Sequence, residues 1–350
     1  MEDRRRGEIL NTRPKVVVTH RVHEPVIQML SEKCDVVAND TAETWPKSRL
    51  EQGARDADAL MVFMPDRIDE SFLAQCPRIK VIAAALKGYD NIDVEACTRG
   101  GVWVTIVTDL LSQPTAELAL ALTLGLTRNV APGDRLIRSG GFQGWRPILY
   151  GGGLSGKTVG IVGMGRLGQT FARLLAGFGV RIIYYDPVKM SPVQEAFFGI
   201  TRSTFDEVVS DSDILVLLAP LIASTLHLID GAAIEKMKKG AYLVNVGRGS
   251  VVDEAAVASA LEQGRLAGYA ADVFEMEDWA RPDHPAQVHP DLLAQSDRTL
   301  FTPHLGTAVE KARLEIEMSA AASILQALRG ERPVDAINEV ERGTPRPARE

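Results

Sequence analysis

Cysteines are few in this sequence and apolar runs are short, which already excludes some classes of protein. The 3 cysteines, Cys34, Cys76 and Cys97, are odd in number and far apart, so they predict neither a disulfide framework nor a metal site. Such a small, odd set of cysteines suits a protein of a reducing compartment. The longest leucine-rich run, residues 118–126, is far shorter than the roughly 20 apolar residues of a membrane-spanning helix. We therefore expect no bound metal and no membrane partner.

Positive charge is not in excess either. Lys and Arg number 39 against 46 Asp and Glu, giving a formal net charge of -7, and no long basic run offsets it, so nucleic acid is not an expected partner. A small basic pocket for an anion remains compatible with this balance, because net charge governs solubility and steering rather than one site. The start, MEDRRRGEIL, has no apolar stretch after its charges and does not resemble a secretory signal. We expect a cytoplasmic protein.

The composition is that of an ordinary globular protein, with 45% hydrophobic and 24% charged residues. A chain of 350 residues exceeds the roughly 250 to 300 that one hydrophobic core supports, which predicts two domains. Short apolar runs in the first part indicate buried parallel strands at residues 15–19, 35–38, 59–63, 81–85 and 102–106. Helical stretches between them predict a doubly wound sheet of the flavodoxin-like type.

A second series of strands and helices begins after a helix that starts near residue 114 and continues towards residue 139. A Gly- and aromatic-rich segment, residues 140–153, reads as a loop or arm. Six strands are then predicted at residues 158–162, 180–185, 213–218, 241–246, 266–273 and 299–304. A helix over residues 308–328 is long enough to return to the first domain.

The predicted fold is therefore α/β with two doubly wound parallel sheets. We expect a Rossmann dinucleotide-binding domain at residues 112–307, which includes the helix and arm of residues 112–153. It is inserted into a discontinuous substrate domain formed by residues 14–111 and 308–340.

A glycine-rich turn follows the strand at residues 158–162. In GMGRLG, Gly163, Gly165 and Gly168 form G-x-G-x-x-G between a strand and a helix. The first glycine permits a tight turn, the second lets a pyrophosphate approach the backbone, and the third allows close packing of helix on strand. The alternative is a glycine-rich turn without a ligand.

The next strand ends about twenty residues later at Asp186, where a carboxylate accepts hydrogen bonds from the adenosine ribose. A 2′-phosphate would meet its negative charge, which predicts NAD over NADP, although Lys189 lies close enough in sequence to weaken the discrimination. In the alternative interpretation, Asp186 only begins a turn with Pro187.

Two later strand ends carry further candidates. Arg248 lies between Gly247 and Gly249, and its forked donors suit an oxyanion, although a surface arginine is the alternative. His304 follows the last strand, where a His paired with a carboxylate suits proton transfer; a structural role is the alternative. The strand before it ends in four candidate carboxylates, Asp272, Glu275, Glu277 and Asp278. The spacing does not select among them.

In the first domain, Lys87 and Gly88 follow the strand at residues 81–85. A glycine there allows backbone amides to meet an anion, and the lysine adds a positive charge. Met64 follows the neighbouring run and can form an apolar wall beside it. A solvated lysine is the commoner alternative.

Taken in order, the motifs GMGRLG, NVGRGSVVDE, DVFEMEDW and FTPHLG, with Asp186, resemble the D-isomer-specific 2-hydroxyacid dehydrogenase family across nearly the whole chain. The resemblance implies that Arg248 binds substrate and stabilises charge, that His304 is the acid–base group and that Glu277 orients it. It also implies a discontinuous substrate domain, NAD as cofactor and a homodimer. The implied cofactor residues further include Thr115, Met164, Arg166, Leu167, Pro187, Ala219, Pro220, Val246, Gly247, Asp272 and Gly306.

A narrower resemblance lies within that family. The segments MPDRID, ALKGYDNID, FQGWRPILYG and YAADVFEMEDWARPD are similar to those of phosphite dehydrogenases. This likeness implies a substrate site that includes Met64, Lys87, Gly88, Trp145 and Tyr150. The wider family usually has Pro at position 278 and lacks the lysine at 87. Phosphite dehydrogenases usually have Glu-Ala at positions 186 and 187 and Cys at 247.

The reaction so implied is oxidation of phosphite, a small oxyanion, to phosphate with reduction of NAD. His304 is the candidate base, and Arg248 competes for that role. Two alternatives remain open: a dehydrogenase for a small 2-hydroxy acid, of the glyoxylate or hydroxypyruvate reductase type, and an NAD(H)-sensing regulatory protein on the same fold.

Overall fold

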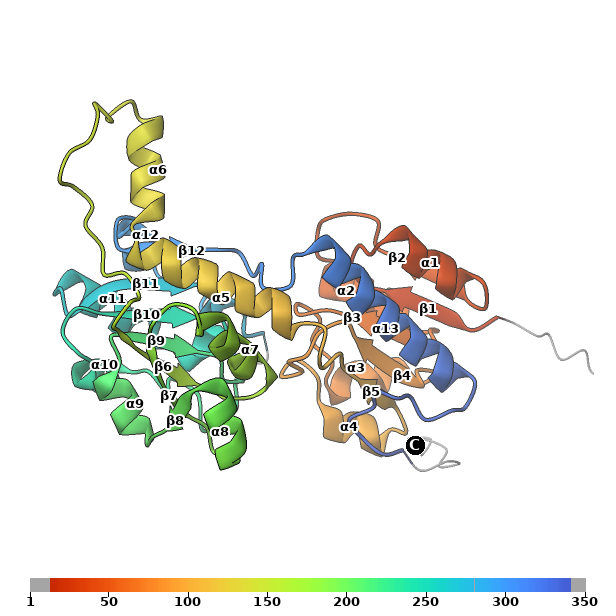
Figure 1. The fold of residues 1–350 in the computed structure, drawn as a ribbon. Helices are drawn as coiled ribbons and strands as arrows, with labels where there is room; N and C mark the ends of the chain where they lie inside the picture. Colours follow the sequence, from red (N-terminus) through yellow and green to blue (C-terminus); the bar gives the residue numbers. More distant parts are fainter. Residues whose placement is uncertain (1–12, 280, 341–350) are drawn as a thin grey trace, which may run out of the picture. The chain divides into compact units, whose positions relative to one another are not determined.

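The computed structural model describes residues 13–279 and 281–340 (Figure 1). The start MEDRRRGEIL, on which the expectation about a secretory signal rested, lies outside the described residues. The chain forms two compact units. The smaller unit joins the residues up to Val107 with those from Leu314 onward, and the larger unit spans Thr108–Arg313.

The smaller unit has a parallel five-stranded sheet in the order β2-β1-β3-β4-β5, the order of flavodoxin-like folds. Its strands are β1 (Lys15–Val18), β2 (Asp35–Ala38), β3 (Ala59–Val62), β4 (Val81–Ala84) and β5 (Trp103–Thr105). Its helices are α1 (Glu24–Ser31), α2 (Lys47–Ala54), α3 (Glu70–Gln75), α4 (Val94–Arg99) and most of α13 (Glu310–Leu328). All residues of β3 and β4 are buried, as expected of parallel strands covered on both faces.

The C-terminal part of the chain is tied into this sheet. Glu317 on α13 accepts hydrogen bonds from the N–H and the ring Nδ1 of His23, at 3.0 and 2.7 Å. Asn338 accepts the N–H of Val104 at 2.9 Å. Figure 1 shows α13 (blue) beside α1 (red). The smaller unit is therefore built from both parts of the chain.

The larger unit has a parallel seven-stranded sheet in the order β12-β11-β10-β9-β6-β7-β8. Its strands are β6 (Thr158–Val162), β7 (Arg181–Tyr185), β8 (Ile200–Arg202), β9 (Ile214–Leu217), β10 (Ala241–Asn245), β11 (Leu266–Ala271) and β12 (Thr299–Phe301). This is the Rossmann order with one additional strand. The predicted fold class is confirmed. The sequence missed β8, because its three residues pair only with β7 and include a single buried side chain, Ile200.

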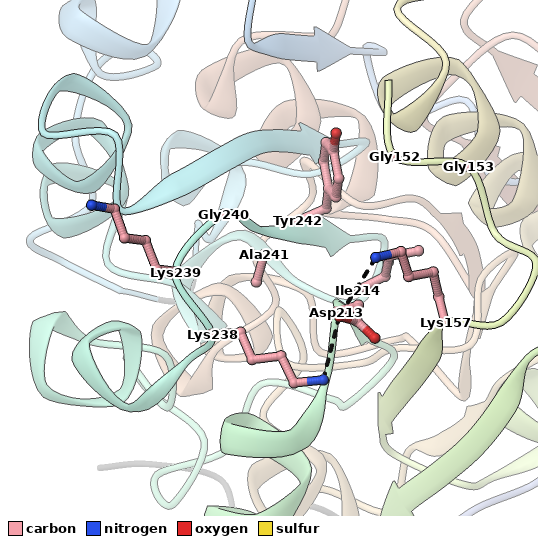
Figure 2. Close-up of a pocket in the computed structure, with 10 residues that line it drawn as sticks. All are labelled: Gly152, Gly153, Lys157, Asp213, Ile214, Lys238, Lys239, Gly240, Ala241 and Tyr242. Atoms are coloured by element: carbon pink, nitrogen blue, oxygen red, sulfur yellow. Dashed lines mark ion pairs between the residues drawn. The ribbon is translucent and has the colours of Figure 1, made fainter. Parts of the chain in front are cut away.

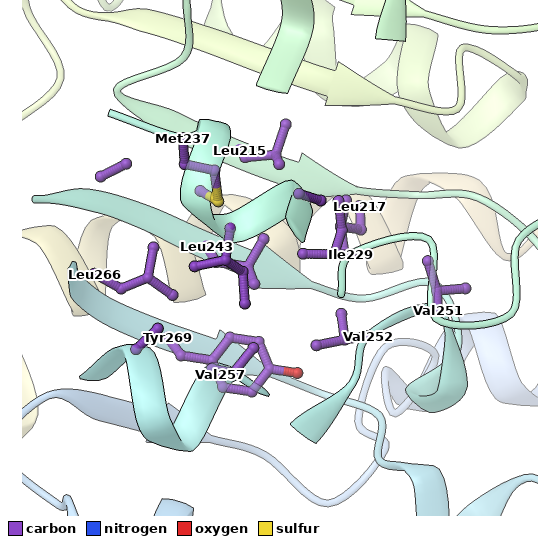
Figure 3. Close-up of a cluster of buried hydrophobic side chains, with 14 of the residues drawn as sticks. Leu215, Leu217, Ile229, Met237, Leu243, Val251, Val252, Val257, Leu266 and Tyr269 are labelled. Carbon is purple, nitrogen blue, oxygen red and sulfur yellow. The ribbon is translucent and has the colours of Figure 1, made fainter. Parts of the chain in front are cut away.

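Helices cover this sheet on both faces. The helices of this unit are α5 (Ser112–Thr127), α6 (Val130–Arg138), α7 (Arg166–Leu175), α8 (Pro192–Phe198), α9 (Phe205–Asp211), α10 (Gly231–Lys236), α11 (Glu254–Glu262) and α12 (Pro290–Ala294), with short 3₁₀ turns η1 (Gly249–Val251) and η2 (Glu275–Glu277). Of these, α6 has no buried residue and does not cover the sheet. Leu215 and Leu217 of β9 pack in one buried cluster, shown in Figure 3, while Ile214 and Val216 pack in the cluster on the other face. Each such side chain contributes roughly 1.5–3 kcal/mol by its burial.

The long helix predicted towards residue 139 is interrupted. Asn129 adopts a left-handed conformation with φ of 52° between α5 and α6. Its side-chain amide donates to the carbonyl groups of Leu149 and Tyr150, at 3.1 and 3.3 Å. We call residues 139–153 the arm; it leaves α6 and returns to this break. Figure 1 shows α6 and the arm (yellow) projecting from the rest of the larger unit.

Candidate active site

The glycine turn between β6 and α7 has the geometry that its three glycines predict. Gly163 has φ of 99°, and a Cβ there would lie 2.9 Å from the carbonyl of Leu218. A Cβ on Gly168 would lie 2.3 Å from the oxygen of Gly163, so this glycine permits close packing of helix on strand. Nothing lies within 4 Å of a Cβ on Gly165. The open position at the start of α7 suits the pyrophosphate of a dinucleotide.

Asp186 follows β7 directly and is fixed to this turn. Its Oδ2 accepts the N–H of Met164 at 2.7 Å, and its Oδ1 accepts the N–H of Val188 at 2.8 Å. Each carboxylate oxygen can accept a further hydrogen bond, so both remain available to ribose hydroxyls. A cavity of about 480 Å³, lined in part by Lys189 and Arg202, lies beside the end of β7. Both side chains are cations, and a cation here would reduce the repulsion between Asp186 and the 2′-phosphate of NADP.

Arg248 stands on a loop that begins at the end of β10. The side chain of Asn245 bridges this loop: its Nδ2 donates to the carbonyl of Arg248 at 2.9 Å, and its Oδ1 accepts the N–H of Gly247 at 3.1 Å. A Cβ on Gly247 would lie 2.6 Å from the oxygen of Ala219. A side chain at position 247 would therefore require the neighbouring main chain at Ala219 to shift.

His304 and Glu277 form a hydrogen-bonded pair. The Nδ1 of His304 lies 2.6 Å from Oε2 of Glu277. The other carboxylate oxygen accepts the N–H of Phe274 at 2.9 Å, which fixes the glutamate to the turn η2. The geometry thus selects Glu277 from the four candidate carboxylates. A ring that donates from Nδ1 presents Nε2 as the nitrogen for proton exchange.

Asp272 holds the turn that carries His304. Its Oδ1 accepts the hydroxyl of Thr302 and the N–H of Leu305, both at 2.6 Å, and its Oδ2 accepts the N–H of Gly306 at 2.8 Å. The carboxyl is buried, and this burial raises its pKa. His304 itself has φ of 54°, a conformation uncommon for a residue other than glycine. The Asp272 bonds stabilise this uncommon backbone.

The remaining residues proposed for the cofactor lie around the same ends of the strands. Thr115, in the first turn of α5, donates to the carbonyl of Gly306 at 3.2 Å. Ala219 and Pro220 follow β9 closely, and Val246 follows β10 directly. The structure therefore gathers these residues near the glycine turn and the Arg248 loop. Their contacts with a cofactor stay predictions.

Lys87, Gly88 and Met64 belong to the smaller unit. Met64 comes after β3, and Lys87 and Gly88 come after β4, its neighbour in the parallel sheet, so all three lie at the same end of that sheet. The side-chain amide of Asn91 donates to the carbonyls of Phe63 and Met64, at 3.1 and 3.3 Å, and fixes the loop after β3. Their contacts with a substrate stay predictions.

Trp145 and Tyr150 lie on the arm. Their exposed fractions are 85% and 79%. Within the described chain the arm therefore presents both side chains to solvent rather than to His304. Their role in a substrate site stays a prediction.

A second cavity of about 210 Å³ lies at the opposite ends of the strands. Lys157 precedes β6, Asp213 precedes β9 and Lys238 lies shortly before β10. Figure 2 shows both lysines directed at the same carboxylate, with the two Nζ atoms 3.9 and 3.3 Å from Oδ1 of Asp213. In an open α/β sheet ligands bind at the carboxyl ends of strands, so this cavity is not the candidate active site.

Sequence reasoning missed two residues that build the site, Asn245 and Ser250. Asn245 holds the Arg248 loop, and an Asn at the end of a buried strand, directly before Val-Gly-Arg-Gly, was a readable signal. Ser250 is hydrogen-bonded to Asp278, one of the four candidate carboxylates, and no pattern in the sequence predicts a bond between two residues 28 positions apart.

No group of three or more His, Cys, Asp or Glu side chains that could hold a metal ion occurs in the part of the chain that the structure describes. None of the helices described is long and apolar enough to cross a membrane.

Comparisons with known proteins agree with this geometry. The family model described as D-isomer specific 2-hydroxyacid dehydrogenase, NAD binding domain, matches residues 120–306. The glyoxylate reductase of Thermofilum pendens is 38% identical over 331 residues, which cover 93% of this chain and 95% of that protein. The glyoxylate reductase of Pyrococcus furiosus is 36% identical over 332 residues, covering 93% and 96%. The crystal structure of a glyoxylate reductase from Paecilomyes thermophila matches with a TM-score of 0.81 and 27% identity, covering 93% of this chain and 98% of that one.

The NAD-binding model supports the predicted cofactor. The relatives reported above bear the name glyoxylate reductase. They do not support the narrower expectation of a phosphite dehydrogenase, and they favour the alternative of a 2-hydroxyacid dehydrogenase.

Proposed function

Because this chain belongs to the D-isomer-specific 2-hydroxyacid dehydrogenase family and is an NAD-binding oxidoreductase, we propose that it reduces a small 2-oxo acid of the glyoxylate type with NADH. The observation that carries the proposal is the His304–Glu277 pair, with 2.6 Å between Nδ1 and Oε2, at the same ends of the strands as Arg248. The glyoxylate reductase names of the relatives support the substrate class.

The residues at these strand ends fit the cofactor. The open position at Gly165 and the start of α7 would receive the pyrophosphate, and Asp186 would accept the ribose hydroxyls. NAD supplies the hydride donor or acceptor when it is bound. The protein contributes orientation and charge around the reacting atoms.

Arg248 and His304 are proposed to have different roles toward the substrate. The guanidinium of Arg248 is proposed to bind the carboxylate of the 2-oxo acid through two parallel hydrogen bonds. Nε2 of His304 gives a proton to the carbonyl oxygen as the carbonyl carbon gains a hydride, so the product is the 2-hydroxy acid. Glu277 accepts from Nδ1 and stabilises the imidazolium that donates this proton. In the reverse direction His304 takes the proton back.

Steady-state turnover by the wild-type protein tests the proposal. NADH consumption is measured with glyoxylate and with hydroxypyruvate, next to NAD reduction with the corresponding 2-hydroxy acids. We expect turnover of at least one 2-oxo acid, and a lower rate with NADPH. Tight NADH binding without turnover of any substrate would contradict the proposal and would favour a nucleotide-sensing protein.

Phosphite oxidation is the second candidate, and one specific observation favours it. Lys87 stands at the carboxyl end of β4, and Met64 stands at the carboxyl end of the neighbouring β3. Phosphite has no carbon chain, so its binding depends on charge-assisted contacts, each contributing roughly 1.5–3 kcal/mol. In this reaction a P–O bond would form from water as the P–H bond breaks, the hydride would pass to bound NAD, and His304 or Arg248 would take the proton released by the water. NAD reduction by phosphite alone, with no turnover of 2-oxo acids, would make this the function.

The proposed assembly is a homodimer formed through α6 and the arm. This region exposes an unusual amount of apolar surface, at Val130, Ile137, Phe142, Trp145, Ile148, Leu149 and Tyr150. Large exposed apolar patches are typical of protein interfaces. Sedimentation of the wild-type protein and of a Phe142→Ser, Trp145→Ser variant tests this, with a dimer expected for the first and a monomer for the second. A monomeric wild type would contradict it.

A cytoplasmic location is proposed as well. The three cysteines, Cys34, Cys76 and Cys97, are few, odd in number and buried, and such a set is typical of proteins in a reducing compartment. Fractionation of cells that make the protein tests the location.

A further inference from the structure

The segment that carries Arg248 and the segment that carries Glu277 are joined by a buried hydrogen bond. Oδ2 of Asp278 accepts the main-chain N–H of Ser250 at 2.6 Å. Asp278 is 1% exposed. Ser250 comes two residues after Arg248, and Asp278 directly follows Glu277. One short hydrogen bond therefore connects the Arg248 loop to the segment of the turn η2, whose Glu277 accepts the hydrogen bond from His304.

Arg281 holds the same serine from its side chain. Its Nη1 donates to Oγ of Ser250 at 2.7 Å and lies 3.5 Å from Oε2 of Glu275. Its main-chain N–H donates to the carbonyl of Asp278 at 2.8 Å. The side chain of Arg281 is 16% exposed. Ser250 is thus bound at its N–H by Asp278 and at its hydroxyl by Arg281.

The main chains of the two segments also touch directly. A Cβ on Gly249 would lie 1.9 Å from the carbonyl carbon of Phe274, so the loop rests on the turn η2 with no room for a side chain. The turn is anchored in its place: Glu275 accepts the N–H of Glu254 at 3.0 Å, and Glu254 accepts the N–H of Glu275 at 2.9 Å. The loop therefore has a rigid support.

We propose that Asp278 and Arg281 are positioning residues that set the placement of Arg248 relative to the Glu277–His304 pair. This inference rests on the proposed function, because it concerns the same acid–base and oxyanion groups. Neither residue is needed as an acid or a base. A misplacement of reacting groups by about 1 Å is enough to cost roughly 100-fold in rate, so a rigid connection between the two segments has a direct catalytic value.

The first test removes the hydrogen bond between Asp278 and Ser250 and compares this variant with a matched control variant. Asp278→Ala loses the acceptor, whereas Asp278→Asn keeps an acceptor oxygen. Asp283→Asn is the control, because Asp283 is exposed and accepts from the same arginine, with both distances 3.2 Å. We expect kcat/KM for the 2-oxo acid to fall about 10- to 100-fold in Asp278→Ala and to recover mostly in Asp278→Asn. The control and the NADH affinity of every variant should stay within about twofold.

A double-mutant cycle separates positioning from a general structural defect. In an Arg248→Lys background, the placement of the guanidinium no longer matters, so Asp278→Ala should cost less than about threefold. Equal losses in both backgrounds would overturn the proposal, as would a loss no larger than that of Asp283→Asn. If Asp278→Ala does not fold, Ser250→Ala enters the same cycle and tests the other half of the proposal, because it removes the hydroxyl that Arg281 binds and keeps the N–H that Asp278 accepts; equal losses in both backgrounds would again overturn the positioning role.

A substrate-free measurement keeps this proposal distinct from the proposed function. Failure of the wild-type protein to turn over any substrate would contradict the function alone. The imidazole of His304, bonded to Glu277 at 2.6 Å, is followed by its ring resonances in the NMR spectrum of the free protein. We expect these resonances to shift in Asp278→Ala and to stay unchanged in Asp283→Asn. Identical spectra of the two variants would overturn the positioning role.

Discussion

The two ends of the strands in the larger unit both carry clustered charges, yet they use them differently. At the amino ends, Lys157 and Lys238 share the carboxylate of Asp213 beside a cavity of about 210 Å³. At the carboxyl ends, Glu277 accepts a main-chain N–H with one oxygen and the ring of His304 with the other. In the first cluster both lysines are directed at one carboxylate, whereas the second cluster fixes its groups and leaves a ring nitrogen of His304 for a ligand.

This difference shows what distinguishes a site from a charged surface. A cavity lined by lysines is not enough, because ion pairs made by partly exposed lysines contribute only about 0.2–1 kcal/mol and are screened by salt. At the carboxyl ends, main-chain N–H groups fix the carboxylates of Asp272 and Glu277, and Asn245 fixes the loop that carries Arg248. Catalysis depends on such fixed placement of charge.

Replacing Arg248 should give the largest loss. Arg248→Gln removes the charge and the forked donors that are proposed to bind the substrate carboxylate. With two charge-assisted bonds lost, at about 1.5–3 kcal/mol each, kcat/KM should fall roughly 100- to 10,000-fold. Steady-state kinetics measures this, with NADH affinity as the control. A change in KM below about tenfold would show that the substrate binds elsewhere.

Glu277→Gln should have the next largest effect. The amide keeps the shape of the glutamate but removes the negative charge that stabilises the imidazolium, so kcat should fall about 10- to 100-fold. KM for the 2-oxo acid should change little. The two constants are obtained from the same saturation curves. An unchanged kcat would mean that the 2.6 Å pair is structural.

Asp186→Ala should weaken cofactor use. Loss of the carboxylate removes the acceptor for the ribose hydroxyls and frees the N–H of Met164. We expect KM for NAD to rise about 10-fold or more and the preference over NADP to narrow. Lys189→Ala is the comparison, because it should affect NADP only. A stronger preference for NAD in Asp186→Ala would contradict this assignment.

Asp213→Asn should change stability and leave catalysis intact. Burial would raise the pKa of Asp213, but the hydrogen bond from Thr158 and the charges of Lys238 and Lys157 outweigh it and lower the pKa. A lowered pKa contributes stability above the unfolded value near 3.8, and this contribution is lost as the pH falls through the folded value. The variant should lose about 1 kcal/mol at pH 7.

Denaturant unfolding at neutral and acidic pH measures this effect. The difference between wild type and Asp213→Asn should shrink as the pH falls below about 4. Lys238→Ala should change kcat/KM by less than about twofold, since it removes only a partly exposed ion pair. A large loss of activity in either variant would show that the amino ends of the strands take part in catalysis, which would contradict this prediction.

Much of this architecture is readable from local patterns in the sequence. The continuous apolar runs predict the buried strands, and the spacing of Gly163, Gly165 and Gly168 predicts the turn between β6 and α7. Shorter or irregular features are not readable in this way. β8 has three residues, and the break at Asn129 depends on hydrogen bonds to Leu149 and Tyr150, about twenty residues away.

The candidate site shows the same limit. Arg248 and His304 could be predicted because each follows an apolar strand at the end where ligands bind. The spacing could not choose Glu277 from four nearby carboxylates, because that choice depends on which oxygen meets the ring of His304 in space. The family resemblance supplied the choice. The bond between Ser250 and Asp278 is visible only in the structure.

His304, at the carboxyl ends of the strands, is proposed to carry the proton transfer. The most direct measurement determines kcat and the NADH dissociation constant for His304→Asn in one preparation. We expect kcat to fall about 100- to 10,000-fold, as for the loss of a general acid–base group, while NADH affinity stays within about twofold. A kcat close to that of the wild type, or a loss of NADH affinity as large as the loss of kcat, would contradict the proton-transfer role of His304.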